Sequence, residues 1–267
     1  MLPCFFMRKI ALVILVSAAL PIYAWGPEGH DLIARIAEAQ LTPEAHAKVV
    51  AILGPGVSMA SVASWADSVR RERPQTGPWH YIDIPIDQKH RDMARDCPKG
   101  DCVIQKIEDF EAVLRDPNAP ATQRREALMF VIHFIGDMHQ PLHSSDDKDQ
   151  GGNGKHVVFQ GRNSNLHSLW DSGLLGRIGA ENDLFPKWEA EAAKHYKGWS
   201  KGSVGDWAEQ SHQLAVKITY GKLPKTTDKT KPYEIDATYE QTADPVIRQQ
   251  IEKAGDRLAR ALNENLK

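Results

Sequence analysis

The 267-residue sequence predicts an all-α fold, a single mainly helical domain with one short β ribbon near residues 155–160. Apolar residues recur at helical spacing through most of the chain, whereas runs typical of strands are almost confined to that ribbon. No repeat, low-complexity tract or linker divides the sequence. The predicted helices cover about residues 31–41, 43–53, 59–71, 101–115, 122–139, 165–175, 181–196, 203–221 and 244–265.

The first 24 residues form a separate element. Arg8 and Lys9 precede an apolar run from Ile10 to Leu20, and Ala24 is small enough to mark a cleavage position. This run is shorter than the about 20 apolar residues that a transmembrane helix needs. We therefore predict a removed secretory signal at 1–24, with an uncleaved anchor as the alternative. The remaining residues, 25–267, would then form one domain of a periplasmic or secreted protein with no stable membrane anchor.

The charge of the mature chain limits how it could bind a partner. Removal of the signal takes away Arg8 and Lys9 and no acidic side chain, so the formal net charge changes from −2 to −4. An acidic protein can attract nucleic acid only through a local positive site. The composition gives no sign of an oligomer, and we expect a monomer.

Turn-forming residues mark the ends of the predicted elements. Thr42 and Pro43 fit an N-cap and a first helical position, and so begin the helix that runs to Leu53. The ribbon at 156–160 follows a glycine-rich stretch at 151–154. We expect loops at Pro74, Pro78, Pro85 and residues 222–233.

Two cysteines remain after the predicted signal. Cys97 and Cys102 enclose only four residues, and export would place them in an oxidising compartment. This spacing predicts a small disulfide loop. A zinc site is the alternative, but no second close pair of cysteine or histidine residues would complete its four ligands.

Residues that could bind metal are concentrated between His133 and Asp171, a stretch that holds five of the eleven histidines. His133 and Asp137 are spaced i, i+4 and would project from one face of a helix, as would His167 and Asp171. His143 follows a proline that should end the helix and direct this histidine elsewhere. Two such pairs with a further histidine favour a metal site over ordinary core or surface histidines.

Cleavage after Ala24 would add a ligand. The freed amino group of Trp25 would have a pKa near 8, so a metal could displace its proton and also bind the Trp25 carbonyl oxygen. His30 lies close enough in sequence to complete the site. The alternative is that Trp25 is an ordinary buried aromatic residue.

Several sequence blocks together carry a family resemblance. They are WGPEGH at 25–30, WADSVR at 65–70, WHYIDI at 79–84, HFIGDMHQPLH at 133–143, GGN at 151–153 and HSLWD at 167–171. In this order and spacing, the chain resembles a bacterial member of the zinc-dependent, single-strand-specific nucleases of the S-one/P-one type. Their superfamily also includes zinc phospholipase C. After Asp171 the match is weak.

The resemblance implies an all-α, phospholipase C/nuclease-like fold with three zinc ions per chain in one cleft. It implies a first zinc held by Asp67, His80, His133 and Asp137, a second held by His143, His167 and Asp171, and a third held by the Trp25 amino and carbonyl groups, His30 and Asp137. Each set mixes imidazole with hard oxygen donors, as catalytic zinc sites do.

The resemblance also implies hydrolysis of single-stranded RNA and DNA to 5′-phosphorylated products, and leaves open whether nucleotides with a 3′-phosphate are also substrates. Asp67 would orient the attacking water or accept its proton, and Arg70 would bind a phosphate oxygen. Tyr81 would stack on a base, and Asp83 and Asn153 would hydrogen-bond it. On spacing alone, a surface ion pair for Arg70 and plain packing for Tyr81 are equally reasonable.

Two other functions remain as alternatives. A zinc phospholipase C would use a similar site, but the short Trp25 to His30 spacing, Asp171 in place of glutamate, and the residues Asp83 and Asn153 argue against it. A zinc-binding protein without catalysis would not need Arg70. A metalloprotease is disfavoured because the sequence contains no HExxH.

Overall fold

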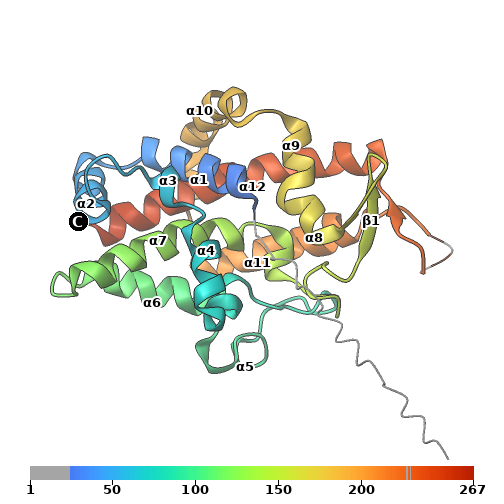
Figure 1. Ribbon diagram of the computed structural model, residues 1–267, viewed down its shortest axis with the longest axis horizontal. Helices are drawn as coiled ribbons and strands as arrows, with labels where there is room; N and C mark the ends of the chain where they lie inside the picture. The colour runs from blue at the N-terminus through green and yellow to red at the C-terminus, as the bar shows by residue number, and fades with distance from the viewer. Residues whose placement is uncertain (1–24, 227, 229) are drawn as a thin grey trace, which may run out of the picture.

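The structure, a computed structural model, describes residues 25–226, 228 and 230–267. The predicted signal at 1–24 lies outside the described residues. The longest helix, α12 (Ala237–Asn265), extends along the long axis of the molecule, and α1 (Pro27–Ala39) packs along it (Figure 1). α10 (Glu181–Trp199) packs on both helices from one side. Two helices from the later part of the chain, α10 and α12, therefore hold α1 in place.

Helices form most of the fold. The others are α2 (Pro43–Leu53), α3 (Met59–Val62), α4 (Trp65–Glu72), α5 (Met93–Asp96), α6 (Val103–Arg115), α7 (Ala121–Met138), α8 (Leu166–Ser168), α9 (Leu174–Ile178) and α11 (Val204–Leu214). Shorter 3-10 turns lie at η1 (Pro74–His80), η2 (Pro98–Gly100) and η3 (Pro141–Ser144), and π turns at η4 (Leu169–Gly173) and η5 (Ala215–Tyr220). The prediction of a mainly helical fold is confirmed.

The central helix is α7. Every residue from Ala127 to Met138 is buried, because α6, α12, α4, α2 and α1 all pack around it. A helix buried on every side presents polar groups to its neighbours rather than to water. His133 and Asp137 on α7 therefore need partners inside the protein, since burying them without partners would cost stability.

A small sheet lies at one end of the molecule. β1 (His156–Phe159) pairs antiparallel with β2 (Arg162–Asn165) and parallel with β3 (Tyr233–Glu234). The predicted ribbon is therefore confirmed, while β3, only two residues long, begins in the stretch predicted as loop. β2 ends directly before α8, so the sheet fixes where the chain enters the segment with His167.

Several predicted helices have different boundaries in the structure. The helix expected at 59–71 is divided into α3 and α4, and the one expected at 244–265 begins earlier, at Ala237. Asp236 caps α12 by accepting a hydrogen bond from the Tyr239 N–H at 2.8 Å, and the helix continues through Pro245. Pro74 and Pro78, expected in a loop, lie in the 3-10 turn η1.

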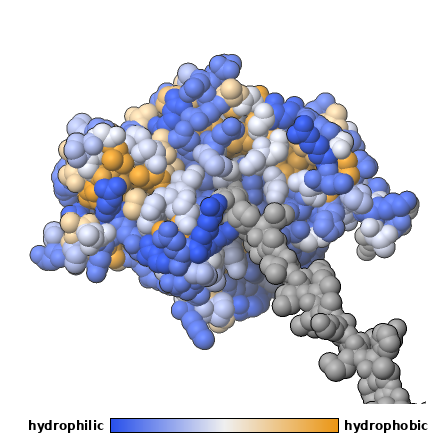
Figure 2. Space-filling model, viewed as in Figure 1, coloured by the Kyte–Doolittle hydropathy of each residue, from blue (hydrophilic) through white to orange (hydrophobic). Residues whose placement is uncertain are grey.

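The disulfide between Cys97 and Cys102 is present. Among the described residues, no helix is long and apolar enough to cross a membrane. The face shown in Figure 2 is largely hydrophilic with smaller hydrophobic areas. This is expected of a protein whose apolar side chains lie mostly in the core.

Candidate metal centre

The structure gathers the predicted ligands into groups whose donor atoms lie within 4.8 Å of one another. The groups are His30, His133 and Asp137; Asp67, His80 and His133; and His143, His167 and Asp171. All eight side chains are buried. The first two groups share His133, so they form one continuous cluster.

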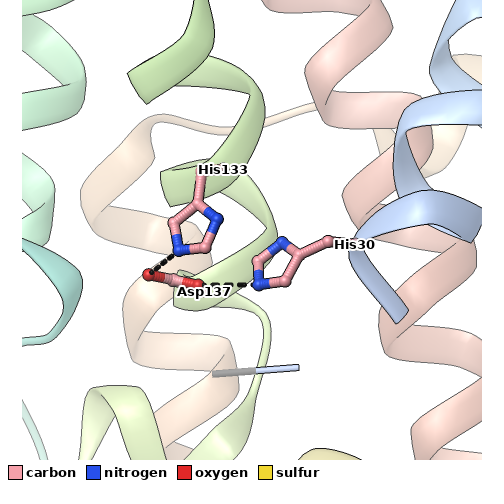
Figure 3. Close-up of side chains that lie close together, drawn as sticks. All are labelled: His30, His133 and Asp137. Carbon is pink, nitrogen blue, oxygen red and sulfur yellow. Dashed lines mark ion pairs between the residues drawn. The ribbon is translucent and has the colours of Figure 1, made fainter. Parts of the chain in front are cut away.

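Asp137 lies at the centre of this cluster. Its Oδ1 is 3.2 Å from His30 Nε2, and its Oδ2 is 3.2 Å from His133 Nε2 (Figure 3). The His30 ring, from α1, stacks on the His133 ring with centroids 4.0 Å apart. The two oxygens of one carboxylate thus face two imidazoles from different helices, which is the geometry of a bridging ligand.

His80 and Asp67 complete the other side of the cluster. His80 Nδ1 is 2.8 Å from Asp137 Oδ2 and 3.2 Å from His133 Nε2. Asp67 Oδ1 lies 3.9 Å from His80 Nδ1 and 3.8 Å from His133 Nε2. Four residues from α4, η1 and α7 therefore direct nitrogen and oxygen donors at one small volume, as predicted for the first zinc.

The third group is assembled from η3 and the segment after β2. Pro141 begins η3 after α7 has ended, and this turn directs His143 toward His167, with the two Nε2 atoms 3.1 Å apart. His167 Nε2 is 3.5 Å from Asp171 Oδ2, across a turn of helix that continues into η4. The predicted i, i+4 pair is thus present, with its partner histidine opposite.

Hydrogen bonds fix the tautomers of His143 and His167. Their Nδ1 atoms lie 2.7 Å from the His80 carbonyl oxygen and 2.6 Å from the Gly151 carbonyl oxygen, respectively. A carbonyl oxygen only accepts, so each Nδ1 carries the hydrogen and each Nε2 presents a lone pair. Two lone pairs 3.1 Å apart repel one another. A cation between or beside them removes that repulsion, and the second nitrogen of each ring is held as metal-binding histidines usually are.

Unpaired buried atoms point to the same conclusion. Both ring nitrogens of His30, His80 Nε2, Asp67 Oδ1 and Asp137 Oδ1 are buried and make no hydrogen bond of good geometry. Buried polar atoms are nearly always satisfied, and imidazole with carboxylate is a donor set that suits zinc. The residues present therefore fit a metal site.

The protonation states of several ligands suit metal binding, and two ligands would lose a proton when a metal binds. Burial lowers the pKa of His143 to about 3 and lowers the pKa of His30 and His80, so these imidazoles are neutral at neutral pH. Burial alone would raise the pKa of Asp137, but the adjacent histidines, His133 foremost, hold it well below its usual range. Burial lowers the pKa of His133, but the charges of Asp137 and Asp67 raise it to about 9, and burial raises the pKa of Asp171 well above its usual range. Neutral imidazole and ionised carboxylate are the forms that bind a metal ion, so metal binding would displace a proton from each of these two.

The first described residues are held against this site. Trp25 is buried, and the N–H of the next residue, Gly26, donates to the Asp171 carbonyl oxygen at 2.8 Å. Gly29 leaves room for the Trp25 side chain, because a Cβ there would lie 2.7 Å from Trp25 Cβ. The main chain at Trp25 therefore lies beside Asp171, a predicted ligand.

A pocket of about 630 Å³ opens next to the third group. It is lined by Tyr81, Asp83, Leu142, Asp146, Lys148, Gln150, Gly151, Asn153 and His167. The three residues predicted to bind a base thus lie together, and His167 joins the pocket to the ligands. Lys148 and Asp146 were not singled out from the sequence, since neither has a spacing that indicates a role.

The charge of Arg70, on α4, acts on the pocket residue Tyr81. Burial raises the pKa of Tyr81, Asp83 raises it further, and the positive charge of Arg70 acts in the opposite direction. Arg70 therefore lies close enough to influence the pocket while sharing its helix with Asp67. Burial, with the charge of Asp146, raises the pKa of Asp83 to about 6.

Spacing predicted the pairs His133 with Asp137 and His167 with Asp171, and the resemblance implied Asp67 and His80, but neither indicated a residue that contacts Asp171. Gln140 is fully buried and donates a hydrogen bond to Asp171, 31 residues later. His139, one position earlier, lies outside the three groups: its Nδ1 is 2.6 Å from the Ile135 carbonyl oxygen, and Arg257 lies 2.7 Å from its Nε2. Its contacts are a backbone carbonyl oxygen and Arg257, so its role is structural.

Comparison with known proteins agrees with this geometry. The family model described as S1/P1 Nuclease matches residues 25–267. The chain is 31% identical to Nuclease P1 of Penicillium citrinum over 90% of this chain and 97% of the relative, and 33% identical to Endonuclease 2 of Arabidopsis thaliana over 95% and 94%. It is also 35% identical to Nuclease S1 of Aspergillus oryzae over 57% of this chain and 55% of the relative. The chain belongs to the S1/P1 nuclease family.

Proposed function

We propose that this chain is a zinc-dependent endonuclease that hydrolyses phosphodiester bonds of single-stranded RNA and DNA to 5′-phosphorylated products. The observation that carries the proposal is the position of the pocket: it begins at His167, within the ligand groups, and contains Tyr81, Asp83 and Asn153. A base bound in this pocket would bring its phosphate to the ligands. The family match supports the nuclease over the phospholipase C alternative.

We assign three zinc ions to the ligand groups. Asp67, His80, His133 and Asp137 would hold the first, His143, His167 and Asp171 the second, and Trp25, His30 and Asp137 the third. Bound zinc supplies positive charge for a phosphate and lowers the pKa of a coordinated water toward 7. The local charge would explain how an acidic protein binds nucleic acid.

The protein side chains would orient the reaction. Asp67 Oδ1 faces His80 and His133 and would hold the first zinc, so the other carboxylate oxygen would orient the attacking water or accept its proton. Arg70, three residues later on α4, would bind a phosphate oxygen with its planar guanidinium. Both groups come from one short helix, which fixes their separation.

The pocket would explain the preference for single strands. Stacking of a base on Tyr81 contributes on the order of 1–3 kcal/mol and tolerates different bases. A base in a duplex must first leave its partner, which costs a few kcal/mol. Asp83 and Asn153 would hydrogen-bond the edge of the base that the partner strand otherwise occupies.

Cleavage of residues 1–24 would complete the enzyme. We propose that export to the periplasm or the medium removes the signal and frees the Trp25 amino group as a ligand. The N–H of its neighbour Gly26 donates to the Asp171 carbonyl oxygen, which supports a position of this main chain beside the proposed ligands. The mature enzyme would be a monomer without a membrane anchor.

The test is an assay of the purified mature protein on four substrates. Single-stranded RNA, single-stranded DNA, duplex DNA and phosphatidylcholine would be compared, with product ends identified by mass spectrometry. We expect cleavage of both single strands to 5′-phosphates, slower cleavage of the duplex, and loss of activity in chelator that zinc restores. Turnover of lipid without cleavage of RNA would establish the phospholipase instead. Zinc binding without turnover of any of the four would establish a binding protein.

A further inference from the structure

Gln140 occupies the junction between α7 and η3, where the chain passes from one ligand group to another. It is fully buried, and its backbone N–H donates to the Asp137 carbonyl oxygen at 2.9 Å. Its own carbonyl oxygen accepts a hydrogen bond from the His143 N–H, also at 2.9 Å. The peptide groups of Gln140 thus join the backbone of two proposed ligands.

The side chain of Gln140 reaches a third proposed ligand. The Leu142 N–H lies 2.6 Å from Oε1, and because a backbone N–H only donates, the atom it contacts must be the amide oxygen. The amide nitrogen therefore points the other way, where it donates to Asp171 Oδ1 at 2.6 Å. The orientation of the amide is fixed by chemistry at both ends.

This hydrogen bond distinguishes the two oxygens of Asp171. Oδ1 is occupied by Gln140, while Oδ2 lies 3.5 Å from His167 Nε2 and faces the third group. We propose that Gln140 is a positioning residue that selects Oδ2 of Asp171 as the metal-binding oxygen and couples its orientation to the turn that carries His143. The inference rests on the proposed function, since it requires a metal at this group.

A second buried glutamine provides the comparison. Gln250 is 1% exposed and also makes two side-chain hydrogen bonds, both donated by its amide nitrogen, to the His139 carbonyl oxygen and to Ser211 Oγ. Neither of these partners belongs to a ligand group. Gln140 and Gln250 therefore differ in what they contact rather than in burial or in the number of side-chain hydrogen bonds.

The experiment compares Gln140→Glu, Gln140→Met and Gln250→Met. Gln140→Glu retains an oxygen for the Leu142 N–H but replaces the donor to Asp171 with a carboxylate oxygen. Gln140→Met removes both hydrogen bonds at nearly the same volume. Zinc per chain would be measured after dialysis against chelator of increasing strength, and the cobalt-substituted proteins would be compared by their visible spectra.

We expect both Gln140 variants to bind the metal at the His143, His167 and Asp171 group about 10–100-fold more weakly, as loss of a hydrogen bond to a metal ligand usually causes. A weaker chelator should therefore remove it. The cobalt spectra of both variants should change, while Gln250→Met should match the wild type in both measurements. Retention of the wild-type metal content and spectrum by both Gln140 variants would overturn the proposal. A wild-type protein that retains no metal would instead overturn the proposed function together with this inference.

An Asp171→Asn background separates positioning from general stabilisation. If Gln140 acts through Asp171, Gln140→Met should change metal retention in the wild-type background and have little further effect in the Asp171→Asn background. A merely structural role would produce the same loss in both backgrounds, and that result would refute the proposal. Thermal melting of each variant shows which are folded, and Gln140→Glu still tests the inference if Gln140→Met does not fold.

Discussion

Gly136→Ala tests whether His30 is held by packing for a role at the metal centre. Gly136 lies on α7 between His133 and Asp137, and a Cβ there would be 2.8 Å from His30 Nδ1 and 3.1 Å from His30 Cε1. Ordinary contact begins near 3.4 Å, so the imidazole must move by about 0.6 Å. The ring has little freedom to do so, because it is stacked on the ring of His133.

The magnitude follows from two opposing effects. Alanine in place of glycine in a helix stabilises it by about 0.5–1 kcal/mol, whereas overpacking of a buried site costs about 1–3 kcal/mol. We therefore expect a net loss of about 0–2.5 kcal/mol in the free energy of unfolding. Displacement of His30 from Asp137 should weaken binding of one metal by about 10–100-fold.

The assay is zinc content against chelator strength, with unfolding in urea measured on the same samples. Gly198→Ala is the matched control, since Gly198 also lies in a helix and a Cβ there would meet nothing within 4 Å. The control should bind zinc like the wild type and be equally or more stable. If Gly136→Ala retained every metal as tightly as the control, the argument that packing holds His30 as a ligand would be wrong.

Four further predictions concern ionisation and metal. Burial raises the pKa of Asp256 to about 7, above its unfolded value near 4, so ionisation in the unfolded chain should reduce stability as pH rises between these values; Asp256→Asn should flatten the melting temperature over that range. Asp83, with a pKa raised to about 6, offers two accepting oxygens to the two N–H groups of a guanine edge only when ionised. The KM for guanine dinucleotides should therefore fall as pH rises through about 6, and Asp83→Asn should lose this dependence. A protein that retains Ala24 before Trp25 lacks the free amino group there and should bind one zinc fewer by elemental analysis. Removal of zinc should lower the melting temperature. Where free zinc had been 1,000 times its Kd, the free energy of unfolding should fall by about 4 kcal/mol.

Part of the candidate site could be predicted from the sequence because its geometry is local, whereas Asp67 and His80 were implied only by the family resemblance. His133 with Asp137, and His167 with Asp171, are each one helical turn apart, and that spacing alone places their side chains on one face. Pro141 likewise predicts the end of α7 and the turn toward His143. The pair on α7 and the pair at His167 and Asp171 come from distant parts of the sequence. Only the family resemblance implied that they share one cleft.

The parts that sequence could not supply depend on long-range packing. The contact of Gln140 with Asp171 joins residues in different elements, and a glutamine at the end of a helix has no spacing that indicates its partner. Asp256 resembles a surface carboxylate of an amphipathic helix, yet it is fully buried because α12 is enclosed on several sides. The early start of α12, at the cap Asp236, was also missed from the sequence.

The burial of α7 links the fold to the proposed chemistry. A helix surrounded by other helices would be most stable with apolar residues throughout, so His133 and Asp137 reduce stability unless their polar atoms are satisfied. Asp137 Oδ1 and both ring nitrogens of its neighbour His30 make no hydrogen bond of good geometry. Ion binding would satisfy them at once, and the same exclusion of water that makes the bare site costly would strengthen its attraction for a phosphate. Stability and activity should therefore depend on the same metal ions. A substitution that weakens metal binding should lower both the free energy of unfolding and the activity.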